Sequence, residues 1–82
     1  MQLKGVAMKC EDWLLAKVAS MLAIGPSDIK IDSHLDYDLY FDSLDKEELN
    51  AAVENEFDVS ITEQMETLQD IVNFVEAKRV ER

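Results

Sequence analysis

The sequence predicts an all-α fold, a small helical bundle interrupted by one long loop. Three stretches carry apolar side chains at helical spacing, and no stretch of useful length alternates apolar and polar residues as a half-buried strand would. Residues typical of helix ends, such as Pro26 and Thr67, separate these stretches. We therefore expect three longer helices and one short helix in a single domain over residues 1–82, with a core of about residues 10–78.

The first helix is predicted over residues 10–24, where apolar residues form one stripe at helical spacing. Gly25 and Pro26 follow, and we expect them to end the helix, with Gly25 at the position that tolerates positive φ. Cys10 lies on the apolar stripe, which favours a small core residue over a reactive thiol.

A long connection is expected over residues 25–41. A loop of this length in a compact domain is usually functional or held by packing of its own. Its apolar residues can pack against the helices as anchors: Ile29, Ile31, Leu35 and Leu39. His34 is the only histidine and has no partner for a metal site, so we expect a solvated or locally bonded loop residue.

The second helix is predicted to begin near Ser43 and to run to Phe57 without an internal Gly or Pro. Asp42 precedes it and is a good N-cap, because its carboxylate can accept from the free backbone N–H groups of the first turn. One face of this helix is expected to be apolar, formed by Leu44, Leu49, Ala52, Val53 and Phe57.

Two further helical segments complete the prediction. Residues 60–66 are long enough for at most one or two turns, which makes them the short helix. Thr67 then caps the last helix, with Asp70 as its partner in a capping box. Apolar residues of that helix fall at the spacing i, i+3, i+4, i+7: Leu68, Ile71, Val72 and Val75.

Composition limits the partners and the location of the protein. The net charge of −10 disfavours binding to nucleic acids and stable binding to anionic membranes, and favours proteins with basic patches. Residues 36–58 hold nine acidic side chains and one basic side chain. One cysteine excludes an internal disulfide framework. Without a signal peptide or a membrane-spanning stretch, we expect a cytoplasmic monomer.

The residues indicate no catalytic machinery and no metal site. Ser43 lacks the Gly-x-Ser-x-Gly elbow of a serine hydrolase, and His34 is the only candidate base. Asp36, Asp38 and Glu47 match three positions of a calcium-binding loop, but Tyr40 and Phe41 replace a ligand and the obligatory Gly. We therefore expect a protein that is not an enzyme and is no EF-hand.

Ser43 is instead well placed to carry a phosphate or a phosphodiester. At a helix start, backbone N–H groups and the helix dipole stabilise an anion, and the hydroxyl can point into solvent. The alternative is that Ser43 merely caps the helix, and the helix pattern alone favours this second interpretation.

At these residues the chain resembles the acyl carrier proteins and related phosphopantetheine carrier domains. Residues 38–45, Asp-Leu-Tyr-Phe-Asp-Ser-Leu-Asp, are similar to the family pattern Asp-Leu-Gly-x-Asp-Ser-Leu followed by an acid. Glu48-Leu49 and residues 54–58 match the later part of the pattern, and the resemblance extends from about Leu14 to Val75. It implies a four-helix bundle of acyl-carrier type.

The resemblance implies that Ser43 carries a covalent 4′-phosphopantetheine arm, added from coenzyme A by a phosphopantetheinyl transferase, a holo synthase. The arm holds an acyl group as a thioester for acyl-transferring and condensing enzymes of fatty acid, polyketide or related biosynthesis. Partner-docking residues would be Asp42, Asp45, Glu48 and Glu54. Residues lining the space for an acyl chain would be Leu49, Val53 and Met65.

Three features depart from the family pattern. Tyr40 stands where the family usually has Gly, so a retained positive φ would strain the backbone there. Lys46 and Asn55 reduce the acidity of the second helix. The segment between Ile61 and Thr67 is short for the family. The alternative function is an acidic protein-interaction module that keeps the carrier fold without the arm.

Overall fold

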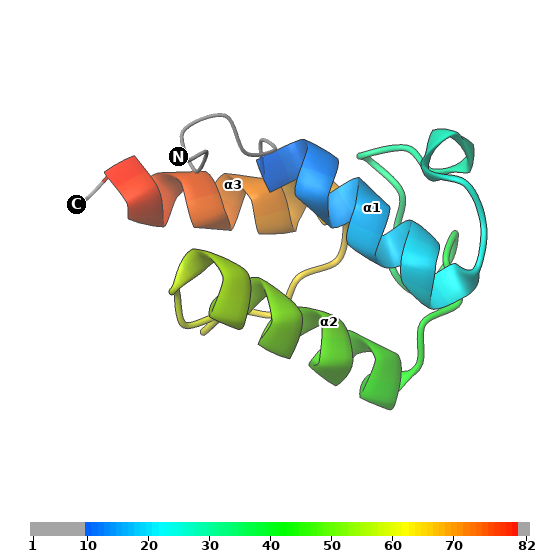
Figure 1. Cartoon of the computed structure of the whole chain (residues 1–82). Coiled ribbons are helices and arrows are strands. Elements are labelled where there is room, and N and C mark those ends of the chain that lie inside the picture. Colours follow the sequence, from blue (N-terminus) through cyan, green and yellow to red (C-terminus); the bar gives the residue numbers. More distant parts are fainter. Residues whose placement is uncertain (1–9, 81–82) are drawn as a thin grey trace.

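The computed structural model describes residues 10–80, so the first nine and the last two residues of the expected domain lie outside the described residues. The elements in chain order are α1 (Cys10–Leu22), the 3₁₀ helix η2 (Pro26–Asp28), α2 (Ser43–Phe57) and α3 (Leu68–Val80) (Figure 1). Residues 10–80 contain no strand, and the prediction of an all-α fold with three longer helices is confirmed.

Helix α1 packs against η2, α2 and α3. The end of α1 and the start of α2 lie at the same end of the molecule (Figure 1). The side chains with no solvent exposure come from all three longer helices and from no other element: Leu14, Val18, Leu49, Val53, Leu68, Ile71 and Val75. Cys10 joins this core with 1% exposure, in agreement with the predicted core position. None of the described helices is both long and apolar enough to cross a bilayer.

The end of α1 differs from the prediction. The helix stops at Leu22, and Ala23 adopts the left-handed conformation with φ 60°. The N–H of Ile24 donates to the carbonyl of Ala19 over 3.0 Å, which satisfies a carbonyl of the last turn. Gly25 was expected to take the positive φ, but its φ is −79°, and Pro26 opens η2.

The start of α3 follows the prediction. The N–H of Asp70 donates to the Thr67 hydroxyl oxygen over 3.1 Å. In return, the Asp70 carboxylate accepts from the N–H of Thr67, also over 3.1 Å. This reciprocal capping box satisfies backbone donors that the first turn of the helix leaves without partners.

The expected short helix over residues 60–66 is absent from the structure, where residues 59–67 run without helical turns. Their backbone groups bond to other elements instead of to each other. The N–H of Ile61 donates to the carboxylate of Glu54, and the carbonyl of Glu66 accepts from the N–H of Leu35 over 2.8 Å. A single helical turn is costly to nucleate, so these outside partners prevail over it.

The connection between α1 and α2 is fixed by apolar side chains and by an antiparallel bridge between His34 and Thr67. Of the predicted anchors, Ile29, Leu35 and Leu39 are buried and Ile31 is partly buried. The N–H of Leu68 donates to the carbonyl of Ser33 over 3.1 Å. The loop that leads to the start of α2 is thereby attached to the start of α3.

Candidate functional site

Ser43 is the first residue of α2, and its side chain is exposed. The helix start is fixed by a reciprocal capping box on either side of it. The N–H of Asp45 donates to the Asp42 carboxylate over 2.9 Å, and the N–H of Asp42 donates to the Asp45 carboxylate over 3.1 Å. The two aspartates therefore determine where the helix begins and place Ser43 at its first position.

The first turn of α2 retains free backbone donors. The capping box uses the N–H of Asp45, and the N–H of Lys46 donates to the carbonyl of Asp42. Within residues 10–80 the N–H groups of Ser43 and Leu44 have no acceptor. These donors and the positive end of the helix dipole stabilise negative charge near the Ser43 hydroxyl, so the residues present fit a phosphodiester at this position.

Tyr40 precedes this helix start by three residues and has a left-handed backbone with φ 58°. This conformation turns the chain so that Leu39 and Phe41 are both buried, while the Tyr40 side chain is 81% exposed. The N–H of Phe41 donates to the carbonyl of Leu35 over 2.9 Å, which closes the turn. A residue with a Cβ in this region costs about 1 kcal/mol relative to glycine.

His34 organises the same loop through local hydrogen bonds. Its Nδ1 accepts from the N–H groups of Asp36 and Tyr37 over 3.1 and 3.3 Å. Its own N–H donates to the Asp38 carboxylate over 2.7 Å. The ring stacks on Tyr37 with 4.2 Å between the centroids. His34 is therefore a locally bonded loop residue, as one of the two predicted alternatives states.

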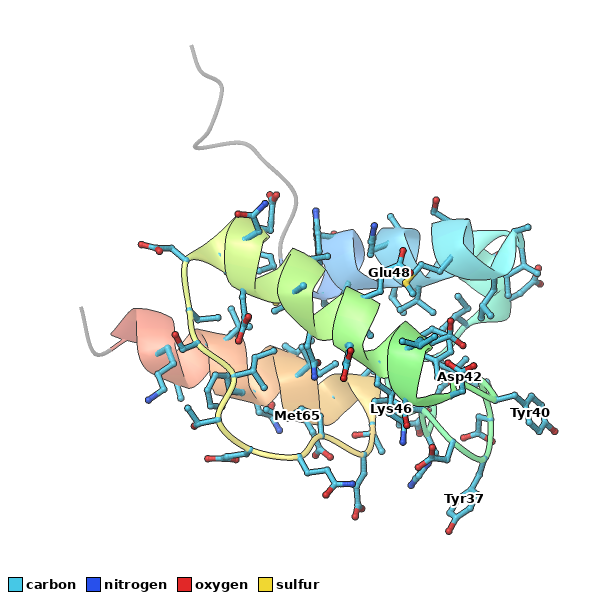
Figure 2. The ribbon with its side chains drawn as sticks, turned by 90° about the horizontal axis from the view of Figure 1, so that it is seen from below. Tyr37, Tyr40, Asp42, Lys46, Glu48 and Met65 are labelled. Carbon is cyan, nitrogen blue, oxygen red and sulfur yellow. The ribbon has the colours of Figure 1, made fainter. Side chains whose placement is uncertain are left out.

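The four acids expected to dock partners differ in what their side chains contact. Asp42 and Asp45 hold the helix start, and the Glu54 carboxylate accepts from the N–H of Ile61 over 2.7 Å. Within residues 10–78 the exposed Glu48 side chain has neither a hydrogen bond nor an ion pair with other residues. Figure 2 shows Glu48 on α2 and Asp42 at the helix start. Three of the four acids thus have structural contacts; the cap by Asp42 was predicted, whereas the contacts of Asp45 and Glu54 were not.

Lys46 lies in the first turn of α2 and forms an ion pair with Asp36, with 2.5 Å between Nζ and Oδ1. The pair joins the helix to the loop that precedes it, and Figure 2 shows Lys46 near the start of α2. Both side chains are partly exposed, so the pair contributes little to stability. The ion pair neutralises one negative charge on the surface near Ser43.

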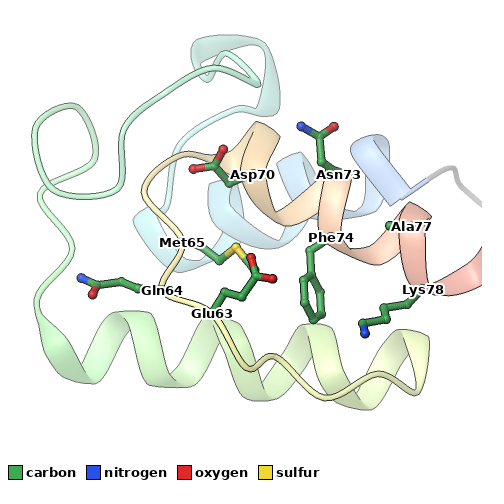
Figure 3. A pocket seen from close by; sticks show the side chains of 8 residues that line it. All are labelled: Glu63, Gln64, Met65, Asp70, Asn73, Phe74, Ala77 and Lys78. Atoms are coloured by element: carbon green, nitrogen blue, oxygen red, sulfur yellow. The ribbon is translucent and has the colours of Figure 1, made fainter.

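The residues expected to line an acyl pocket are not brought to one cavity. Leu49 and Val53 have no exposed surface, and they are part of the closed core. Met65 is 7% exposed and lines a hollow of about 550 Å³ between residues 63–65 and α3. Figure 3 shows the Met65 and Phe74 side chains in this hollow, with polar side chains around them.

Leu44 is a surface residue that the sequence analysis placed on the apolar face by mistake. Its side chain is 74% exposed. At about 100° per residue, Leu44 lies about 180° around the helix from the buried Val53. The position of Leu44 around the helix could therefore have identified it as a surface residue from the sequence. Tyr37, 76% exposed, is a second large apolar side chain on this part of the surface.

The arrangement offers attachment rather than catalysis. In residues 10–80 no three or more His, Cys, Asp or Glu side chains are placed to hold a metal ion. Asp36, the first residue of the calcium-loop match, is paired with Lys46, and Glu47 lies within α2. Ser43 is a reachable hydroxyl beside free N–H donors, on a rigidly capped helix surrounded by acids.

Comparison with known proteins agrees with this arrangement. Residues 12–76 match the family described as the phosphopantetheine attachment site. An acyl carrier protein of Phaeodactylum tricornutum is 41% identical over 63 residues, which cover 72% of this chain and 83% of the relative. An acyl carrier protein of Chlamydia trachomatis is 33% identical over 76 residues, covering 88% and 99%. One of Prochlorococcus marinus is 36% identical over 77 residues, covering 84% and 96%.

Proposed function

The chain belongs to the acyl carrier protein family, and on this premise we propose that Ser43 is the residue that bears its 4′-phosphopantetheine arm. The protein is a carrier with a phosphopantetheine attachment domain and is not an enzyme. We place the whole chain, residues 1–82, in one carrier domain. The arm, when bound, supplies a terminal thiol that holds an acyl group as a thioester.

The observation that carries this proposal is the position of Ser43. Its hydroxyl is exposed in the first turn of α2, beside N–H groups that have no acceptor in residues 10–80. The capping box of Asp42 and Asp45 holds the helix start in place. A transferase can therefore approach the hydroxyl without unfolding the loop.

In the loading step the Ser43 oxygen forms a new bond to phosphorus, and its proton goes to a base of the transferase. The pyrophosphate linkage of coenzyme A breaks, and the adenosine bisphosphate leaves. The role of this chain is to present the hydroxyl and to stabilise the resulting anion with the Ser43 and Leu44 N–H groups.

We assign partner docking to the acidic surface of α2. Glu48 is exposed, and among residues 10–78 its carboxylate has no hydrogen bond or ion pair that would compete with a partner's basic side chain. Asp42, Asp45 and Glu54 keep their charges near the surface while they hold backbone donors. Cytoplasmic enzymes with basic patches, which load, elongate or transfer an acyl group, are the proposed partners.

We further propose that a bound acyl chain is sheltered by Leu49, Val53 and Met65. The hollow at Met65 offers an entrance from the surface, and Leu49 and Val53 belong to the closed core. Insertion of a chain therefore requires α2 to move away from the rest of the bundle. Fatty acid, polyketide and other acyl cargoes all fit this attachment chemistry.

Incubation of the apo protein with coenzyme A, Mg²⁺ and a broad-specificity phosphopantetheinyl transferase tests the proposal by intact mass. We expect one arm on the wild type and none on Ser43→Ala. An unmodified wild type, or an equal mass increase on Ser43→Ala, would contradict it. Unmodified Ser43 in native cells, together with co-purifying proteins, would support an interaction module without the arm.

A further inference from the structure

Three large apolar side chains project into solvent within eight residues around Ser43. They are Tyr37, Tyr40 and Leu44, which are 76%, 81% and 74% exposed. We call these three residues the anchor patch. Figure 2 shows Tyr37 and Tyr40 pointing away from the body of the protein at the end where α2 begins. Among residues 10–78, whose side chains the structure describes, only one other large apolar side chain, that of Ile24, is exposed.

Tyr40 is the member of this patch that the fold explains least. Its backbone has φ 58°, a conformation that glycine adopts without strain and tyrosine does not. Its ring is almost fully exposed, so the folded chain gains little from burying it. The turn accounts for the left-handed backbone but not for the aromatic side chain. Strain of this kind is concentrated at functional positions, and exposed tyrosines are common anchors of interfaces.

The distance from Tyr40 to Ser43 indicates which partner protein covers the anchor patch. Three residues of chain place the Tyr40 Cα at most about 11 Å from the Ser43 Cα. A partner interface of about 800 Å² covers a patch of roughly 16 Å radius. An enzyme whose active site closes over the Ser43 hydroxyl therefore covers Tyr40 as well. The acids around the patch, including Asp38 and Asp42, favour basic side chains at the rim of the partner's site.

We propose that Tyr40 is an apolar anchor for the transferase that loads the arm. The partner presents an apolar hollow for the ring, flanked by basic side chains. This inference rests on the proposed function. Tyr40 acts in recognition and takes no part in bond formation at Ser43, so its loss affects binding of the carrier and not the chemical step.

Steady-state loading by the phosphopantetheinyl transferase of the organism that makes this carrier, with the carrier as the varied substrate, tests this inference. Tyr40→Asn keeps a side chain that tolerates positive φ, Tyr40→Gly removes the side chain, and Tyr40→Phe keeps the ring. We expect the first two to raise the KM for the carrier by about 5–30-fold, as hot-spot residues do, with kcat within about twofold. Tyr40→Phe and the remote control Glu76→Ala keep the wild-type KM.

The outcomes separate this inference from the proposal on which it rests. A wild type that is loaded, with an unchanged KM for Tyr40→Asn and Tyr40→Gly, overturns the anchor and leaves the role of Ser43 intact. A KM for Tyr40→Phe as high as that of Tyr40→Asn overturns the ring as the contact. A wild type that takes up no arm overturns both proposals. Circular dichroism of each variant confirms that a changed KM does not reflect unfolding.

Discussion

The carboxylate of Glu54 accepts a hydrogen bond from the backbone N–H of Ile61 over 2.7 Å, which joins the end of α2 to the segment that follows it. The bond is partly buried. Because Ile61 lies in a segment without helical turns, its N–H would otherwise have to find water. Glu54 is therefore a structural residue in addition to any role at the surface.

We predict that Glu54→Ala lowers the free energy of unfolding by about 1–2 kcal/mol, because it removes a charged acceptor from a backbone donor. Urea denaturation measures the change. Glu48→Ala, which removes an exposed acid from the same helix, is the control and should stay within about 0.5 kcal/mol of the wild type. Equal midpoints for Glu54→Ala and Glu48→Ala would show that the bond to Ile61 contributes nothing.

At the start of α2, substitutions of Asp42 can separate the effect of its charge from the effect of the hydrogen bond that it accepts. Asp42→Asn keeps an oxygen that can accept from the N–H of Asp45, whereas Asp42→Ala removes it. We expect Asp42→Ala to lose about 1 kcal/mol of stability and Asp42→Asn to lose less than half of that. Thermal denaturation of both variants measures the difference, and identical losses would argue against the cap.

Docking by charge predicts a salt-dependent loading rate. Asp45→Asn combined with Glu48→Gln removes two charges and preserves an acceptor for the capping box. We expect a several-fold lower kcat/KM at low ionic strength and a difference from the wild type that shrinks as salt rises. Loading rates of variant and wild type that respond equally to salt would exclude charge-steered docking at these two residues.

We predict that tyrosine at position 40 lowers the free energy of unfolding relative to glycine. Tyr40→Gly relieves the strained backbone, so we expect it to raise the free energy of unfolding by about 1 kcal/mol. For a domain of this size that corresponds to a melting temperature higher by about 4–8 °C. Calorimetry tests this, with Tyr37→Gly as a control from the same loop. A Tyr40→Gly variant less stable than the wild type would refute the strain.

The proposed cargo shelter predicts where an acyl chain perturbs the protein. On loading a medium-chain acyl arm, we expect methyl NMR shifts at Met65, which lines the hollow, and at Leu49 and Val53 as α2 moves outward. The arm without an acyl group is the matched control. Shifts confined to Leu44 and the exposed tyrosines would place the cargo on the surface and refute the shelter.

The sequence was sufficient to predict the three longer helices, the N-caps of the second and the last of them, and the place of Ser43. These features depend on local chemistry: apolar spacing within each helix, and short side chains such as Asp42 and Thr67 that accept from nearby donors. The positive φ at Tyr40 was indicated by the family's usual Gly and not by local chemistry, and the structure has φ 58° there.

The features that the sequence analysis missed depend on contacts between distant residues. Residues 59–67 were expected to include a short helix, but Glu54 and Leu35 bond to their backbone groups. No pattern within residues 59–67 indicates that their backbone groups bond to distant residues such as Glu54 and Leu35. The structural roles of Asp45 and Glu54 were missed for a related reason. The sequence alone does not distinguish an acid that accepts from a backbone N–H from an acid that is free to bind a partner protein.

The antiparallel bridge between His34 and Thr67 has a consequence for how the molecule opens. Helix α2 lies entirely within the stretch of chain that this bridge closes. It can therefore separate from the core and return while residues 33–35 stay joined to residues 66–68. In amide hydrogen exchange we therefore expect α2 to behave as a sub-global cooperative unit, and the Leu35 and Leu68 amides to exchange only when the whole domain unfolds. Under the proposed shelter for an acyl chain, α2 opens around the cargo while the bridge keeps the rest of the chain joined.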